Sequence, residues 1–150
     1  MHTLIRGVFM SSRCKYTTKE VELLARLIKA EAQGEGKKGM LLVGNVGINR
    51  VVAKCDLFKK VHSIRQMVYQ KPGGFTSINS KLFNSGVNKM QKNIALKTIK
   101  SWQGFPATRS LFFYSPGKNK TCKTKFYGDF VGKYKGHCFY QFGKDKKCGL

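Results

Sequence analysis

Two glutamates, Glu31 and Glu35, are the residues whose type and spacing best suit acid–base chemistry. The chain has only 7 acidic residues against 29 lysines and arginines, so two carboxylates four positions apart are distinctive. Apolar residues at 24, 27 and 28 recur at helical spacing, and the same register continues to Glu31. A carboxyl group against apolar neighbours loses hydration, which favours the protonated form that can donate to a leaving oxygen. The alternative is a solvated glutamate at a helix end.

Glu35 has two interpretations. A negative charge in the last turn of a helix opposes the helix dipole, so Glu35 is unfavourable there unless it has a function. Gly34 and Gly36 bracket it, so it could also lie beyond the helix. If the helix continues, residues four apart share a face, and Glu35 could orient Glu31 or activate a water molecule.

The elements that would position these groups follow from capping residues, periodicity and glycines. Thr17 and Glu20 form a capping box that predicts a helix ending near 32 or 33, where glycines at 34, 36 and 39 interrupt it. The remaining pattern predicts helices at 38–53, 63–69 and 88–102, a loop at 71–76, strands at 111–114, 126–127 and 137–142, and a solvated Lys-rich loop at 118–125. Helices followed by a small antiparallel sheet indicate an α+β fold, with a flexible arm at 1–16 and one domain at 17–150.

The charge of the chain restricts its partners. The formal net charge is +22 and the isoelectric point is near 10.1. Such a field favours polyanions, which include nucleic acid, anionic membranes and acidic wall polymers. No apolar run is long enough to predict a membrane span. Residues 1–10 do not resemble a signal peptide because Arg6 interrupts a short apolar run, so we expect synthesis in the cytoplasm without a cleaved signal.

The five cysteines leave several possibilities open. Their number is odd and no C-x-x-C pair occurs, so no local zinc signature is present. Buried free thiols are the default expectation, and a disulfide near the C-terminus is possible. Convergence of Cys122, His137, Cys138 and Cys148 on a metal is a weaker alternative.

Two motif matches lead to other functions. Residues 34–39 fit G-x-G-x-x-G, but a helix precedes them where a dinucleotide fold needs a strand. Residues 135–142 partly fit an RNA-recognition strand, and the high positive charge makes nucleic-acid binding the runner-up. The helical N-terminal half does not match the order of elements in such an RNA-binding module.

Five stretches in order resemble the SleB/CwlJ cell wall hydrolases, the spore cortex-lytic enzymes, and most closely the short CwlJ type. The resemblance extends over about residues 20–142. It is carried by Ala30-Glu31-Ala32-Gln33-Gly34-Glu35, by Asn49-Arg50-Val51, by 64–75, by Leu111-Phe112-Phe113-Tyr114-Ser115-Pro116 and by Gly136-His137-Cys138-Phe139-Tyr140.

The resemblance implies a lysozyme-like α+β domain that cleaves peptidoglycan glycan strands, in spore cortex or in another bacterial wall. The essential glutamate of the family corresponds to Glu31, which would act as a single acid and base in a lytic transglycosylase or a glycosidase. The resemblance implies no metal or cofactor for the chemistry. It is compatible with a phage-associated enzyme and with a spore-coat or activating partner protein. A non-catalytic basic coat protein is the remaining alternative.

Four further residues are candidates for substrate binding in the resulting cleft. They are Asn49, Phe75, Tyr114 and His137. Core packing is the alternative for each, and buried amides such as those of Asn45 and Asn49 need hydrogen-bond partners in any case.

Overall fold

Helix α2 (Thr18–Ala32) begins at the predicted capping box. The Thr17 side chain accepts from the Glu20 backbone N–H, and the Glu20 side chain accepts from that of Thr17.

The computed structural model describes residues 12–117, 119–143, 146 and 148–150. Residues 1–11, which include most of the predicted arm and the segment compared with a signal peptide, lie outside the described residues. Near the first described residue of the chain, Arg13 donates its backbone N–H to the carbonyl oxygen of Ile99.

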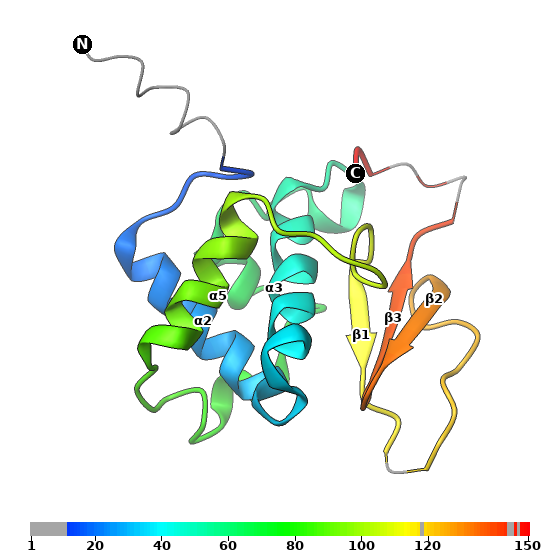
Figure 1. Ribbon diagram of the computed structural model, residues 1–150. Helices are drawn as coiled ribbons and strands as arrows, with labels where there is room; N and C mark the ends of the chain where they lie inside the picture. Colours follow the sequence, from blue (N-terminus) through cyan, green and yellow to red (C-terminus); the bar gives the residue numbers. More distant parts are fainter. Residues whose placement is uncertain (1–11, 118, 144–145, 147) are drawn as a thin grey trace.

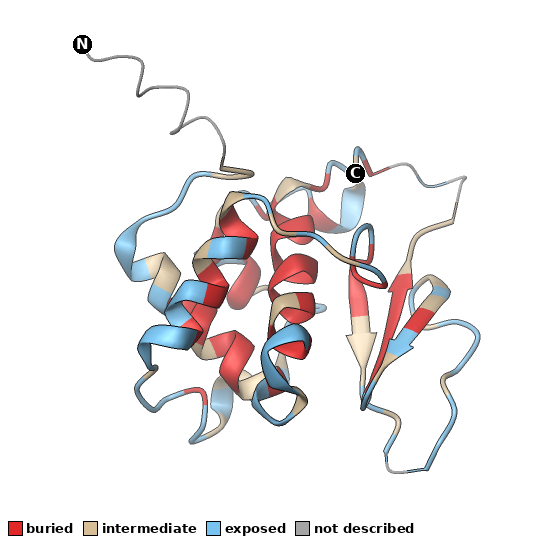
Figure 2. Cartoon of the chain, in the orientation of Figure 1, coloured by how far each residue is buried: buried red, intermediate tan, exposed pale blue. Residues whose placement is uncertain are grey.

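Three helices form one side of the domain and a sheet forms the other (Figure 1). Helices α2, α3 (Gly36–Val52) and α5 (Lys89–Lys100) contact one another, and α3 lies between the other two and the sheet in this view. The shorter elements are η1 (Gln33–Glu35), η2 (Asp56–Phe58), α4 (Ile64–Val68) and η3 (Thr76–Asn79). Figure 2 shows α3 buried over most of its length, as its nearly uniform apolar surface predicts.

The turn between α2 and α3 differs in detail from the prediction. Gly36 has a φ of +77°, a conformation that favours glycine, and α3 begins there. Gly39 does not interrupt a helix as predicted but lies inside α3, where an added Cβ would collide with the Glu35 side chain. Gly39 therefore allows close packing at the turn. A sequence pattern alone does not distinguish a glycine with this role from one that ends a helix.

The sheet has the order β1–β3–β2 and is antiparallel throughout, with β1 at Phe112–Tyr114, β2 at Asp129–Tyr134 and β3 at His137–Gln141. The predicted strand at 126–127 is wrong. Those residues precede β2 in a turn, and Tyr127 has a φ of +63°. Strand β2 was missed because it is an edge strand whose side chains are half-buried or exposed and that contains charged residues and a glycine. The other elements confirm the α+β prediction.

The structure contains two disulfides among the described residues, one that joins the two halves of the chain and one within the C-terminal half. Cys55 pairs with Cys148, and Cys122 pairs with Cys138, while Cys14 is a free thiol. The default expectation of free thiols is therefore wrong for four of the cysteines, and the possible disulfide near the C-terminus is confirmed. The same pairing overturns the idea of a metal site that uses Cys122, Cys138 and Cys148. Within the described ranges no helix has both the length and the apolar character needed to cross a membrane.

Candidate active site

A pocket of about 450 Å³ opens where the end of α2 meets the sheet and the loop that precedes η3. Its lining residues come from α2, α3, η2, that loop and the start of η3, β1 and the residue after it, the turn before β2, and the start of β3. They are Glu31, Arg50, Leu57, Pro72, Gly73, Gly74, Phe75, Thr76, Phe112, Phe113, Tyr114, Ser115, Phe126, Tyr127 and His137.

Glu31 lies in the last turn of α2 and is half-buried. The apolar stripe of this helix is in the core, with Leu24, Leu27 and Ile28 fully buried. Glu31 continues the helical register of these residues, and it lies near the C-terminal end of α2, where its side chain lines the pocket. Among the residues that line the pocket, Glu31 is the only one with a carboxylate.

Arg50 supplies a positive charge to the same pocket. Its guanidinium donates to the carbonyl oxygens of Leu111 at 2.8 Å and Gly73 at 2.9 Å, and it lies 4.6 Å from the centroid of the Phe75 ring. Burial lowers the pKa of Arg50 to about 10, and the nearby charge of Glu31 works in the opposite direction. The sequence offered one signal for it, a lone arginine in a helix of apolar residues, but Arg50 was not predicted as a site residue.

Glu35 does not line the pocket but holds one of the residues that do. Its Oε1 accepts from the Gly136 backbone N–H at 2.8 Å and lies 2.9 Å from Nδ1 of His137. Both side chains are shielded, with exposures of 17% for Glu35 and 7% for His137. A Cβ at position 136 would lie 2.9 Å from the same oxygen, so a larger residue there would displace the Glu35 carboxylate from this contact.

The two glutamates are not a continuous helical pair. Helix α2 ends at Ala32, whose φ of −145° and ψ of 14° depart from α-helical values, and Glu35 belongs to η1. The prediction that Glu35 faces Glu31 through an i, i+4 spacing assumed one uninterrupted helix. The break turns Glu35 toward the β2–β3 turn instead.

Three of the four predicted binding residues lie in the pocket. The Phe75 ring is stacked on Phe113 with 5.9 Å between centroids, and the His137 ring meets Phe113 edge-on at 5.2 Å. Tyr114 lies at the end of β1, with its ring 4.7 Å from Phe126. These aromatic side chains form one wall of the pocket beside the carboxylate.

Asn49 lies outside the pocket and is completely buried. Its amide nitrogen donates to the carbonyl oxygens of Ala107, Thr108 and Ser110, and its oxygen accepts from Arg13 and Asn45. The Asn49 amide thus holds the loop that leads into β1 by hydrogen bonds to its backbone.

Several lining residues were not predicted. Thr76, Ser115 and Tyr127 bring hydroxyl groups to the pocket, and Tyr127 is 71% exposed at its rim. They come from loops that sequence periodicity does not place.

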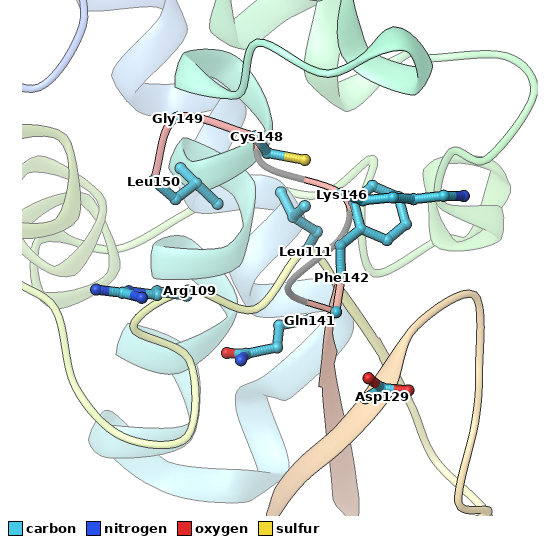
Figure 3. A pocket seen from close by; sticks show the side chains of 10 residues that line it. Arg109, Leu111, Asp129, Gln141, Phe142, Lys146, Cys148, Gly149 and Leu150 are labelled. Atoms are coloured by element: carbon cyan, nitrogen blue, oxygen red, sulfur yellow. The ribbon is translucent and has the colours of Figure 1, made fainter.

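A larger pocket of about 770 Å³ lies beside the C-terminal segment (Figure 3). It contains Arg109, Asp129 and Lys146 but shares no lining residue with the pocket at Glu31.

The family model for cell wall hydrolases matches residues 34–140, which is more than half of the chain. The chain belongs to the cell wall hydrolase family. The match includes Glu35, Arg50 and His137, and it begins three positions after Glu31. Two cell wall hydrolases named CwlJ are close in sequence. That of Oceanobacillus iheyensis is 45% identical over 84% of this chain and 89% of its own length, and that of Bacillus subtilis is 44% identical over 83% and 87%.

Solved structures of the catalytic domain of SleB share the fold of this family member. The Bacillus cereus domain superposes with a TM-score of 0.66 at 23% identity, covering 85% of this chain and 93% of that domain. The Bacillus anthracis domain, described as a germination-specific lytic transglycosylase, also has a TM-score of 0.66, at 21% identity, with 84% and 97% coverage. At these identities the likeness is one of fold.

Proposed function

We propose that this cell wall hydrolase cleaves the glycan strands of peptidoglycan as a lytic transglycosylase, with Glu31 as both general acid and general base. One observation carries the choice of reaction. The pocket is lined by a single carboxylate, whereas hydrolysing glycosidases usually place two carboxylates across the scissile bond. A transglycosylase can manage with one because the sugar supplies its own nucleophile.

The reaction then has two proton transfers through the same residue. Glu31 protonates the oxygen of the scissile glycosidic bond, and that bond to C1 breaks to leave an oxocarbenium-like centre. The sugar's 6-hydroxyl closes on C1 while the Glu31 carboxylate takes its proton. The products are a free hydroxyl on the departing sugar and an anhydro ring on the other. Water is not consumed, and Glu31 is protonated again.

Arg50 and the aromatic wall support this chemistry from different sides. The buried guanidinium of Arg50 keeps a positive charge near Glu31 once the acid has lost its proton. Its two carbonyl contacts also fix β1 and the loop that carries Phe75. Phe75 and Tyr114 give the pocket an aromatic wall that sugar rings can contact, and His137 is positioned by Glu35 to donate or accept a hydrogen bond.

The positive charge of the chain suits an anionic wall. Peptide stems and wall polymers carry carboxylates and phosphates, and a field of +22 would concentrate the enzyme on them. We place its action at the cell wall or spore cortex. Binding to purified sacculi should therefore weaken strongly between low and high salt.

The deciding experiment compares wild type with Glu31→Gln on purified cortex and vegetative peptidoglycan, followed by mass analysis of the released fragments. Glu22→Gln is the matched control, since Glu22 is an exposed glutamate on the same helix. Wild type and the control should release anhydro-muropeptides. Glu31→Gln should be slower by about 10²–10⁴-fold, the usual contribution of a general acid or base.

The fragments themselves test the reaction type. Ordinary reducing ends in place of anhydro ends would refute transglycosylation and indicate hydrolysis. Full activity of Glu31→Gln would remove Glu31 from the chemistry. Failure of the wild type to cleave either wall would refute glycan cleavage and favour a basic binding protein.

A further inference from the structure

A third pocket, a groove of about 830 Å³, runs along α5 and reaches the start of α3. We call it the α5 groove. Its lining residues are Lys37, Lys89, Met90, Asn93, Ile94, Leu96, Lys97, Lys100, Ser101 and Trp102. None of them lines the candidate active site, and the proposed reaction does not account for their chemistry.

The α5 groove combines positive charge with an apolar floor. Four of its ten residues are lysines and none is acidic. Met90 is 37% exposed, and Leu96 and Trp102 are half-buried, so apolar surface is accessible between the ammonium groups. Lysines gathered around a groove without a carboxylate favour an anionic ligand.

Core residues pack against Trp102 and restrict its side chain. It packs against a small core cluster of Leu42, Val46, Ala107 and Phe139. Gly104 also lies close to the ring, because a Cβ there would come within 2.7 Å of the indole. A rigid, partly exposed indole loses little entropy on binding, which suits a contact surface for a flat or ring-shaped group.

A series of contacts between cationic and aromatic residues leads from the α5 groove toward the active site. Lys37 lines the groove, and the adjacent Lys38 has its Nζ 5.5 Å from the centroid of the Tyr134 ring. Tyr134 packs against the same cluster as Trp102 and is paired in the sheet with His137, which lines the active site. Lys135 adds a second ammonium 5.6 Å from the Tyr134 ring.

We propose that the α5 groove is an accessory site for the same wall polymer, binding a stretch of glycan through the carboxylates of its peptide stems. This inference rests on the proposed function and deepens it. Lysines pair with the stem carboxylates, and Trp102 contacts the sugar or stem between them. The surface at Lys38 and Tyr134 connects the accessory site to the point of cleavage, so one long strand can occupy both.

The sole tryptophan of the chain allows a direct test. Peptidoglycan strands that retain their stems are titrated into the full chain carrying Glu31→Gln, to prevent shortening of the ligand, and Trp102 fluorescence is recorded. We expect a saturable change, and we expect strands stripped of their stems by an amidase to bind at least about tenfold more weakly, since several charge contacts are lost.

A groove variant, Lys37→Gln with Lys97→Gln and Lys100→Gln, tests the lysines. Its Kd for stem-bearing strands should rise about tenfold. In the otherwise wild-type chain, cleavage of intact sacculi should slow, while cleavage of short soluble fragments, which cannot reach both sites, should remain within about twofold.

A control variant, Lys59→Gln with Lys60→Gln and Lys81→Gln, loses the same charge from exposed positions outside the groove. An equal loss of affinity in both variants would overturn the proposal, because net charge alone would explain it. No change in Trp102 fluorescence, equal binding of stripped strands, or preference for teichoic acid or DNA over stem-bearing strands would also overturn it. Stem-dependent binding in the groove, together with a wild-type chain that cleaves neither cortex nor vegetative wall, would instead refute only the proposed function.

Discussion

The contact between Glu35 and the β2–β3 turn gives the sharpest test of how this site is organised. Glu35 accepts from Gly136 N–H and contacts His137 Nδ1, and both side chains are mostly shielded from water. Hydrogen bonds to charged groups contribute about 1.5–3 kcal/mol each. Glu35→Ala removes both, so we expect a loss of about 3 kcal/mol of unfolding free energy. For a chain of this length, this corresponds to a decrease in Tm of about 6–12 °C.

Glu35→Gln separates positioning from chemistry. The glutamine oxygen can still accept from Gly136 N–H and from a His137 Nδ1–H, so we expect a loss of only about 1 kcal/mol. Cleavage of peptidoglycan should then stay within about threefold of wild type. Glu35→Ala, which leaves His137 unsupported at the pocket, should reduce kcat/KM by about tenfold.

A double-mutant cycle checks the coupling. His137→Phe keeps a ring against Phe113 but removes the hydrogen bond to Glu35. Combined with Glu35→Ala, it should show a coupling of about 1–2 kcal/mol in thermal unfolding, since the two residues share one interaction. A positioning role for Glu35 is refuted if Glu35→Gln unfolds like wild type yet loses a hundredfold or more of its activity. That result would make Glu35 a catalytic group.

Three further predictions concern stability and thiol reactivity. Replacing Cys122 and Cys138 together by alanine opens a loop with a sequence separation of 16, so scanning calorimetry should show a loss of about 3 kcal/mol, and an unchanged Tm would contradict it. Burial, assisted by Glu20, raises the pKa of the Cys14 thiol to about 11, so iodoacetamide at pH 8 should label it about a hundredfold more slowly than in the unfolded chain, the rate increasing as the pH approaches 11. Equal rates would place Cys14 in water. Asn49→Ala leaves the carbonyls of the 107–110 loop unpaired and should cost about 2–4 kcal/mol with KM unchanged, whereas a selective rise in KM would return Asn49 to the substrate site.

The helical half was predictable because its signals are local. The capping box at Thr17 and Glu20, and the apolar spacing that ends at Glu31, are properties of residues within one or two turns. The same holds for the buried character of α3. Strand β2 was not predictable in this way. It is an edge strand without apolar alternation, and it is held by pairing with β3 across a turn.

The amino-acid sequence by itself determined the α+β order of elements, the basic character of the surface and the place of Glu31 at the end of the apolar stripe of α2. The tertiary structure decided which groups join it. Arg50 is held in the pocket because the carbonyl oxygens of Gly73 and Leu111 both accept from its guanidinium. Glu35 points away from Glu31 because α2 ends at Ala32. These outcomes depend on contacts between segments far apart in sequence, including the Glu35–His137 pair, which spans 102 positions, and no local pattern encodes such contacts.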